Sequence, residues 1–412
     1  MTDAVAVTGI GAVSTFGAGA ACLTDALREG ASGIRRCDDA ALGLPWWAPL
    51  PALDWATAGA ALAPMLRQAL HRAGHGGGAA LQSALLAAAE AWQQAGAGAG
   101  DRVGVIVAGS NLNQQEAAAA WARHATGKAV RPSYAMHFMD TDYVGALSEM
   151  LSLHGEGFTA GGASGSGGVA LALGRRALLS GDVDAVLVVG VPMLLSGAEA
   201  AALTAVGAAY SGTAATGCRP FDRDAAGFVY GQAGAAIVLE RQTQVRRQGR
   251  QALALLAGAA MGLDGKRGTH PSVAGEAATM RAALAQAGLP AHAIDLVSAH
   301  GSSSATGDQA EAQALREVFS AAPRQPCINA PKALLGHCLA GAGVLEAVAV
   351  VAQLQQGFVH GHPTLDAPID AALRWCGKRH ETRSLGAALS NSFGFSGINT
   401  SQIFVHPEYQ PS

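Results

Sequence analysis

Short apolar runs alternate with longer segments of helical periodicity along most of the chain. The short runs predict buried strands over residues 4–8, 102–108, 185–189, 235–239, 252–257 and 294–299. The longer segments predict helices over residues 169–179, 275–287, 307–319 and 344–355. The first strand is expected to end in a tight turn at Gly9-Ile10-Gly11. This alternation predicts a layered α/β architecture with largely parallel sheets.

The series of strands and helices occurs twice, and a polar segment separates the two occurrences. That segment, RQTQVRRQGRQ over residues 241–251, is the best candidate for a junction. We therefore expect an N-terminal half over residues 1–250 and a C-terminal half over residues 251–412.

Composition indicates a compact globular protein. Of the 412 residues, 50% are apolar and 14% are charged, which is unlike a disordered chain. The net charge of −3, without a basic tail, gives no sign of nucleic-acid binding. The longest apolar run, residues 185–195, contains Gly190 and Pro192 and is too short to span a membrane. The absence of a signal-peptide pattern, together with six cysteines that form no CxxC pair, predicts a reducing cytoplasmic location without a structural zinc site.

Four glycine-rich stretches carry the candidate chemistry, and each is expected at the end of a strand. They are GGASGSGG (161–168), SAHGSSSATGDQAEA (298–312), APKALLGHCLAGAG (330–343) and SNSFGFSGIN (390–399). Glycine lets the backbone approach a ligand closely, so a polar side chain beside it is a candidate for a site. Each stretch alone also has a structural interpretation, since serine is a preferred helix N-cap.

Ser164 lies where an apolar run passes into a helix, the place at which many enzymes present a nucleophile. The serine hydrolase motif Gly-x-Ser-x-Gly requires glycine at position 166, where this chain has Ser166. A dinucleotide-binding motif at Gly9-Ile10-Gly11 fails as well, because its third glycine position holds Ser14. Neither motif accounts for the serine.

The four stretches together resemble the type II β-ketoacyl-[acyl carrier protein] synthases, a branch of the thiolase fold. Residues 162–167 match the family motif Thr-Ala-Cys-x-Ser-Gly and place Ser164 on its cysteine. His300 opens a match to His-Gly-Thr-x-Thr, and Lys332 and His337 match the family's lysine and second histidine. Phe395 lies in a match to the Gly-Phe-Gly-Gly gate, and CRPFDRDAAGFVYG (218–231) matches a further segment. The resemblance covers the whole chain and implies duplicated halves that form a five-layered αβαβα core.

The resemblance also implies which residues form the site. The catalytic group would be Ser164, His300, His337, Lys332 and Phe395, supported by Asp308, Glu311, Glu346, Gly394 and Gly397. Lys332 and Glu346 are expected to order the histidines rather than to touch substrate. The backbone N–H of Phe395 is expected to join that of Ser164 in an oxyanion hole.

The serine in place of cysteine changes the function that the resemblance implies. In the elongating enzymes a cysteine thiolate carries the growing chain, and a serine hydroxyl does not ionise as a thiol does. The two histidines, which would stabilise the enolate formed when a malonyl thioester loses CO2, are retained. This combination, with GEGFT-x-GGAS over residues 155–164, resembles a decarboxylating subfamily of polyketide β-branching cassettes. Its members convert malonyl-carrier protein to acetyl-carrier protein.

Two other functions stay open at this point. A histidine that acts as a base toward Ser164 would make the protein a serine-dependent acyltransferase or a slow condensing enzyme. The third function is a non-catalytic subunit like the chain-length factors that pair with active ketosynthases. Chain-length factors commonly lose the histidines, so the presence of both His300 and His337 argues against that role.

The implied partner is an acidic acyl carrier protein, which would carry the substrate on its phosphopantetheine arm. No permanently bound cofactor, metal, nucleic acid or membrane is expected. The candidates for a carrier-protein docking site are Arg67, His71, Arg72, Lys128 and Arg131. A homodimer is expected through residues 104–162, and an enzyme like hydroxymethylglutaryl-CoA synthase would use the product.

Overall fold

The computed structural model describes residues 4–98, 102–215 and 217–409. Strand β1 (Val5–Ser14) lies near the middle of a mixed sheet, and all its residues are buried. Its sequence, VAVTGIGAVS, consists of small and apolar residues, as expected of a strand that is covered on both faces. The prediction of a strand over residues 4–8 is therefore too short, because Gly9 and Gly11 lie inside the strand and not in a turn.

One path of strands crosses the molecule in the order β12-β11-β15-β16-β10-β1-β9-β7-β5-β6, with β2 (Gly17–Ala18) paired to β1. The N-terminal group is β1, β5 (Val103–Ala108), β6 (Gly157–Ala160), β7 (Ala185–Gly190) and β9 (Gly234–Arg241). The C-terminal group is β10 (Ala254–Leu263), β11 (Leu296–Ser298), β12 (Cys327–Asn329), β15 (Ala387–Gly394) and β16 (Ile398–Val405). One smaller sheet consists of β3 (Arg35–Arg36), β4 (Trp46–Ala48) and β8 (Tyr230–Gly231). A second consists of β13 (Phe358–Val359) and β14 (Glu381–Thr382).

The two groups of strands have the same arrangement on either side of the antiparallel β1–β10 pair. Counted outward, β9, β7, β5 and β6 correspond to β16, β15, β11 and β12. In each group the two inner pairings are antiparallel and the two outer pairings are parallel. The prediction of largely parallel sheets is therefore wrong. Apolar runs carry no information on strand direction, and the short connection from β15 to β16 forces those two strands to be antiparallel.

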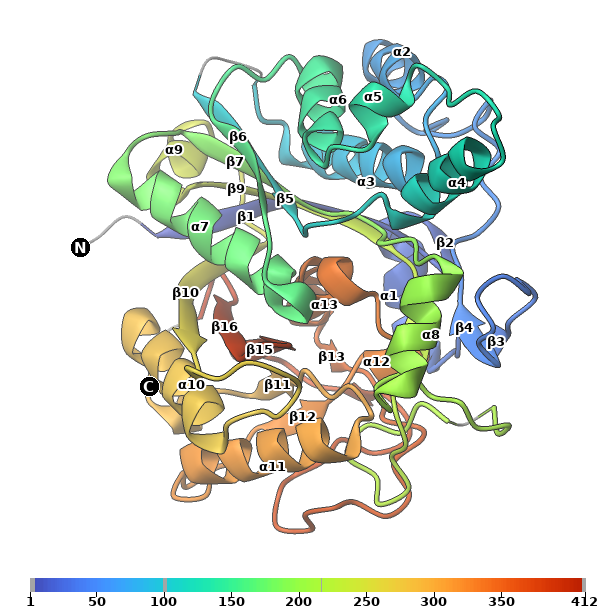
Figure 1. Cartoon of the computed structure of the whole chain (residues 1–412). Helices are drawn as coiled ribbons and strands as arrows, with labels where there is room; N and C mark the ends of the chain where they lie inside the picture. Colours follow the sequence, from blue (N-terminus) through green and yellow to red (C-terminus); the bar gives the residue numbers. More distant parts are fainter. Residues whose placement is uncertain (1–3, 99–101, 216, 410–412) are drawn as a thin grey trace.

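Helices cover both outer faces of the sheet and fill the space between its two parts (Figure 1). Over the N-terminal strands lie α2 (Pro64–Ala73), α3 (Ala79–Ala95), α4 (Gln114–Ala125), α5 (Tyr134–His137) and α6 (Thr141–Leu151). The C-terminal strands are covered by α10 (Val273–Ala287) and α11 (Ala305–Phe319). Between the two parts lie α7 (Ser166–Ser180) and α13 (Ala342–Gln356). This order of layers, αβαβα, is that of the thiolase fold, as predicted.

Helix α13 is the core helix of the molecule. The segment Leu339–Gln356 is long and apolar enough to cross a membrane, but 89% of it is buried inside the protein. It packs against β9 and β7 from one group of strands and against β15 from the other. A largely apolar helix is expected in such a place.

The predicted junction over residues 241–251 connects β9 to β10 and contains the short helix α9 (Gln242–Arg247). Arg250 anchors it through an ion pair with the buried Glu240, at 2.6 Å, and Glu240 also accepts a hydrogen bond from Thr8 Oγ1 at 2.6 Å. The boundary between halves at residue 250 stays a prediction.

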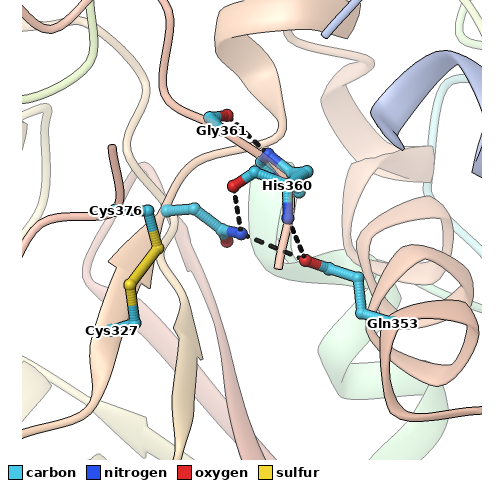
Figure 2. Close-up of a disulfide and its surroundings, with 6 residues drawn as sticks. Cys327, Gln353, His360, Gly361 and Cys376 are labelled. Carbon is cyan, nitrogen blue, oxygen red and sulfur yellow. Dashed lines mark hydrogen bonds between the residues drawn. A yellow bond between two sulfur atoms is a disulfide. The ribbon is translucent and has the colours of Figure 1, made fainter. Parts of the chain in front are cut away.

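Two of the six cysteines form a disulfide, which joins Cys327 of β12 to Cys376 (Figure 2). The pair is buried beside a network in which Gln353 accepts a hydrogen bond from the backbone N–H of His360 at 3.0 Å. Cys22, Cys37, Cys218 and Cys338 are free. This pair is not predicted by the sequence, because the two cysteines are 49 positions apart and no local spacing connects them.

Helix α3 packs directly on β1 because two glycines of the strand face it. A Cβ on Gly9 would lie 1.9 Å from Ala91 O, and a Cβ on Gly11 would lie 2.0 Å from Ala87 O. The two alanines are one helical turn apart, so small residues on the helix meet glycines on the strand. These glycines therefore serve helix packing.

Gly11→Ala is expected to destabilise the protein by about 1–3 kcal/mol, because the added methyl group overpacks the contact with α3. The matched control is Gly145→Ala in α6, where a Cβ would meet nothing within 4 Å. Alanine should stabilise that exposed helical position by up to about 1 kcal/mol. Urea unfolding measures both variants, and a Gly11→Ala protein as stable as the wild type would contradict the packing account.

Candidate active site

Ser164 lies in a short 3-10 segment, Ala163–Gly165, between β6 and the start of α7. Ser166 holds this turn: its Oγ accepts a hydrogen bond from Gly162 N–H at 2.8 Å and donates one to Ala163 O at 2.7 Å. Ala163 has a φ of 48°, in the left-handed region that is unfavourable for a residue with a side chain. The serine at position 166 that excludes the hydrolase motif is therefore the residue that closes the turn.

His337 lies between α12 (Lys332–Leu335) and α13, and its Nε2 is 3.0 Å from Ser164 Oγ. On the other side of the ring, Nδ1 accepts a hydrogen bond from the backbone N–H of Leu339 at 3.2 Å. A ring nitrogen that accepts a hydrogen bond carries no proton, so the neutral imidazole holds its proton on Nε2. His337 therefore presents an N–H group to Ser164.

His300 follows β11, and Lys332 sets its orientation. The Nζ atom of Lys332 is 3.3 Å from His300 Nδ1 and 2.5 Å from His300 O, and it also bonds to the carboxylate of Glu346. An ammonium group has three protons and cannot accept a hydrogen bond, so these three partners use all its protons. His300 Nδ1 is consequently an acceptor, and the ring proton of His300 is also on Nε2.

Both imidazoles are neutral at physiological pH. Burial lowers the pKa of His300 and of His337 well below the usual value, and the charge of Lys332 lowers both further. The two rings are 5.5 Å apart, centre to centre, and are inclined by 82°. Both residues line the same cavity. Two neutral N–H donors at this place can bind an oxygen atom that gains negative charge.

Two buried carboxyl groups of α11 hold the loop that carries His300. Glu311 accepts hydrogen bonds from the backbone N–H groups of His300, at 2.9 Å, and Gly301, at 2.8 Å. Asp308 accepts one from the N–H of Ser303 at 3.1 Å. Burial raises the pKa of Glu311 and raises that of Asp308 to about 8. Both groups act on the backbone of the loop and lie outside the cavity lining.

Phe395 lies in the turn between β15 and β16 and lines the cavity, with 41% of its surface exposed. Its neighbour Gly394 allows close contact with the Ser164 turn, because a Cβ there would lie 2.3 Å from Gly162 O. Gly397 has a φ of 69°, which favours glycine. The structure thus places Gly394 beside the Ser164 turn and Gly397 beside Asp264.

The cavity has a volume of about 480 Å³, and Ser164, His300, His337 and Phe395 all line it. Its apolar lining includes Met193, Leu195, Ala202, Leu203, Ala208 and Phe228, partly from α8 (Gly197–Ala205). Its polar lining includes Asp264, Thr269, His270, Glu276, Ser302, Ser304 and Asn399. Sequence reasoning missed the loop over residues 264–271 and Glu276, although the glycine-rich run LDGKRGTHPS after β10 was a signal. Within the described ranges, no three His, Cys, Asp or Glu side chains form a group that could hold a metal ion.

The five basic residues predicted to bind a carrier protein lie outside the cavity lining. Arg67, His71 and Arg72 share helix α2, and Lys128 and Arg131 follow α4. His71 is half-buried and the other four are exposed. Arg72 lies 3.9 Å from Glu149, a weak surface ion pair.

The geometry agrees with comparisons to known proteins. Residues 2–245 match the family model described as "Beta-ketoacyl synthase, N-terminal domain", and residues 253–366 match its C-terminal domain. A Bacillus subtilis protein, the polyketide biosynthesis malonyl-ACP decarboxylase PksF, is 36% identical over 326 residues, which are 77% of this chain and 78% of that protein.

Solved structures agree in fold over nearly the whole chain. The ishigamide ketosynthase/chain length factor has a TM-score of 0.87 at 26% identity, with 98% of this chain and 100% of that chain covered. A β-ketoacyl synthase from Burkholderia phymatum has a TM-score of 0.83 at 26% identity, with 98% and 99% covered. With the thiolase fold, the paired histidines and both family models in place, the chain belongs to the β-ketoacyl synthase family.

Proposed function

We propose that this protein decarboxylates a malonyl group carried by an acyl carrier protein and releases acetyl-carrier protein. The observation that carries the proposal is the pair of neutral imidazole N–H donors that line one cavity with a serine at the family's nucleophile position. The relative from Bacillus subtilis, which bears the name of such a decarboxylase, supports it.

The two donors suit the charge that develops in this reaction. When the malonyl thioester loses CO2, the electron pair of the broken C–C bond forms an enolate with negative charge on the thioester oxygen. The Nε2–H group of His300 donates a hydrogen bond to that oxygen, and the Nε2–H group of His337 exchanges its contact with Ser164 Oγ for one to the same oxygen when substrate is bound. Each fixed donor of this kind contributes about 3 kcal/mol, or ~10²–10³ in rate. The enolate then takes up a proton at carbon and becomes an acetyl thioester.

The contacts of Ser164 argue against a serine-dependent acyltransferase. A general base would need an unprotonated nitrogen within hydrogen-bond reach of the hydroxyl. The nitrogen at 3.0 Å is His337 Nε2, which holds the ring proton because Leu339 N–H occupies Nδ1. Ser164 therefore accepts a hydrogen bond as a neutral hydroxyl and is not activated for attack on an acyl group.

Lys332 and Glu346 act on His300 and not on substrate. Neither lines the cavity, and their contacts end on the His300 ring, the His300 carbonyl and each other. Phe395 borders the cavity beside the serine turn, and we assign its backbone N–H, with that of Ser164, to an oxyanion hole. The glycines on either side of Phe395 permit the gating motion that substrate entry needs.

A non-catalytic role like that of a chain-length factor has less support. Such a subunit needs no preorganised donors, whereas here Lys332 and Leu339 hold both histidines in the donor tautomer. A similar solved structure is of a ketosynthase/chain length factor, so the shared fold alone does not separate the two roles.

The substrate is presented on the phosphopantetheine arm of an acyl carrier protein, and the reaction takes place in the cytoplasm.

The protein forms a dimer with a second copy of itself. Strand β6 is the last strand of the sheet path, so one of its edges is unpaired in the described chain. Exposed apolar side chains occur in the same region, at Trp121, Met136, Phe138, Met139 and Phe158. Apolar exposure of this kind supports a dimer through residues 104–162. The product would supply an enzyme like hydroxymethylglutaryl-CoA synthase.

His300→Ala and His337→Ala should each lower acetyl-carrier-protein formation by about 10²–10³-fold, because each removes one donor to the enolate oxygen. Ser164→Ala should retain substantial decarboxylation, since no covalent step uses the hydroxyl. Mass spectrometry of malonyl- and acetyl-carrier protein after incubation with pure enzyme measures all three. An inactive Ser164→Ala protein, or an acyl group on Ser164 during turnover, would support the acyltransferase instead.

Charge reversal of Arg67 and Arg72 together should raise the KM for malonyl-carrier protein and weaken its dependence on salt, because the two charges steer an acidic partner. The control reverses Arg246 and Arg247, two exposed arginines on α9, and should leave KM unchanged. An unchanged KM in the Arg67 and Arg72 variant would contradict a docking site on α2.

A further inference from the structure

Glu276 is a buried glutamate that lines the cavity and has no assigned role. It lies in the first turn of α10, it is 1% exposed, and its Oε2 has no hydrogen-bond partner. A buried carboxyl group without a partner costs free energy, so its presence in a substrate cavity requires an explanation.

The surroundings of Glu276 connect it to the histidine that binds the enolate. One helical turn further along α10, Met280 Sδ lies 3.4 Å from Asn391 Nδ2, and Asn391 in turn donates to Glu311 at 3.0 Å. Glu311 holds the backbone of His300. The face of α10 that carries Glu276 therefore packs against the network that positions His300.

Gly275, the residue that precedes Glu276, lies close to a residue of the cavity lining. A Cβ on the preceding Gly275 would lie 3.1 Å from Asn399 Nδ2, and Asn399 pairs with Phe393 across β15 and β16. The ring of Phe393 is 5.8 Å from that of His300. Asn399, Phe393, His300 and Glu276 all line the same cavity.

The groups around Glu276 keep its carboxyl protonated. The charged groups that act on it are Asp264 from the loop after β10 and Asp308 and Glu311 from α11, and all three are acidic. Burial, followed by the electrostatic effect of these acidic neighbours, raises the pKa of Glu276 well above its usual value. The shift favours the protonated carboxylic acid, which can donate a proton.

Decarboxylation without condensation requires such a donor. A condensing enzyme uses the enolate carbon to attack an acyl group, whereas a decarboxylase must protonate that carbon. We infer that Glu276 is the acid that protonates the enolate carbon, so that each turnover ends with a proton transferred from its carboxyl group. This inference rests on the proposed function.

The step balances without a further reactant. The bond between the malonyl α-carbon and its carboxylate breaks, CO2 leaves, and the electron pair forms the enolate. The pair then returns to carbon and forms a C–H bond with the proton of Glu276. The resulting Glu276 carboxylate takes a proton from water, so one solvent proton is consumed for each acetyl group formed.

Glu276→Gln tests the inference, because glutamine has the same shape and cannot act as the acid. The substrate is malonyl-carrier protein with one deuterium placed stereospecifically on the α-carbon, and the reaction is run in tritiated water. The wild type should give a methyl group of a single configuration, since a fixed acid delivers the proton from one side. The variant should be slower by about 100-fold at an unchanged KM and should give a mixture of configurations.

A stability measurement tests the raised pKa of Glu276 independently of catalysis. The raised pKa means that folding disfavours the ionised form of Glu276. The free energy of unfolding therefore falls as the pH rises above about 4.3, the pKa of a glutamate in the unfolded chain. Glu276→Gln should therefore raise Tm at neutral and mildly alkaline pH. Glu317→Gln, at an exposed glutamate of α11, is the control and should change neither rate nor configuration.

The outcomes distinguish the inference from the proposed function. If the variant stays within threefold of the wild-type rate, or is slow but keeps a single configuration, Glu276 is not the proton donor and the decarboxylase assignment stands. A mixed configuration from the wild type leads to the same conclusion. If the wild type forms no acetyl-carrier protein, both the proposed function and the inference fail.

Discussion

Lys332 Nζ is buried between Glu346 and His300, and each of its three protons has an acceptor. Removal of an ammonium group from water costs several kcal/mol, and only a complete set of partners offsets that cost. The arrangement has a chemical consequence, because it makes His300 Nδ1 an acceptor and leaves the ring proton on Nε2. The backbone N–H of Leu339 does the same for His337. Under the proposed function, the donors to the enolate are thus set before substrate arrives, which is the condition under which they lower a barrier most.

The duplicated fold brings these groups together from distant parts of the chain. Ser164 precedes α7 and His337 precedes α13, and these two helices occupy corresponding places in the two groups of strands. They touch near their N-termini, where a Cβ on Gly167 would lie 2.5 Å from Val344 N. Contact at the helix starts therefore places Ser164 Oγ within 3.0 Å of His337 Nε2. The close packing of small residues is what makes this geometry possible.

Much of this site is predictable from sequence, because local motifs carry it. The glycine-rich stretches identify Ser164, His300, Lys332 and His337, and the helical periodicity over residues 344–355 agrees with α13. Other features depend on contacts between distant segments. The glycines of β1 resemble a turn in sequence because the facing alanines of α3 lie about 80 residues away. Glu276 was missed for the same reason: only the folded chain places its carboxyl group in the cavity.

The most direct test of the account is the protonation state of the two histidines, measured by 15N NMR of protein labelled at histidine. Resonances of His300 and His337 can be assigned with single alanine variants among the 13 histidines of the chain. The account predicts that both rings are neutral at physiological pH and carry their proton on Nε2, and that loss of the ammonium in Lys332→Met releases His300 from this tautomer. An imidazolium at neutral pH, or a proton on Nδ1 of either ring in the wild type, would contradict it.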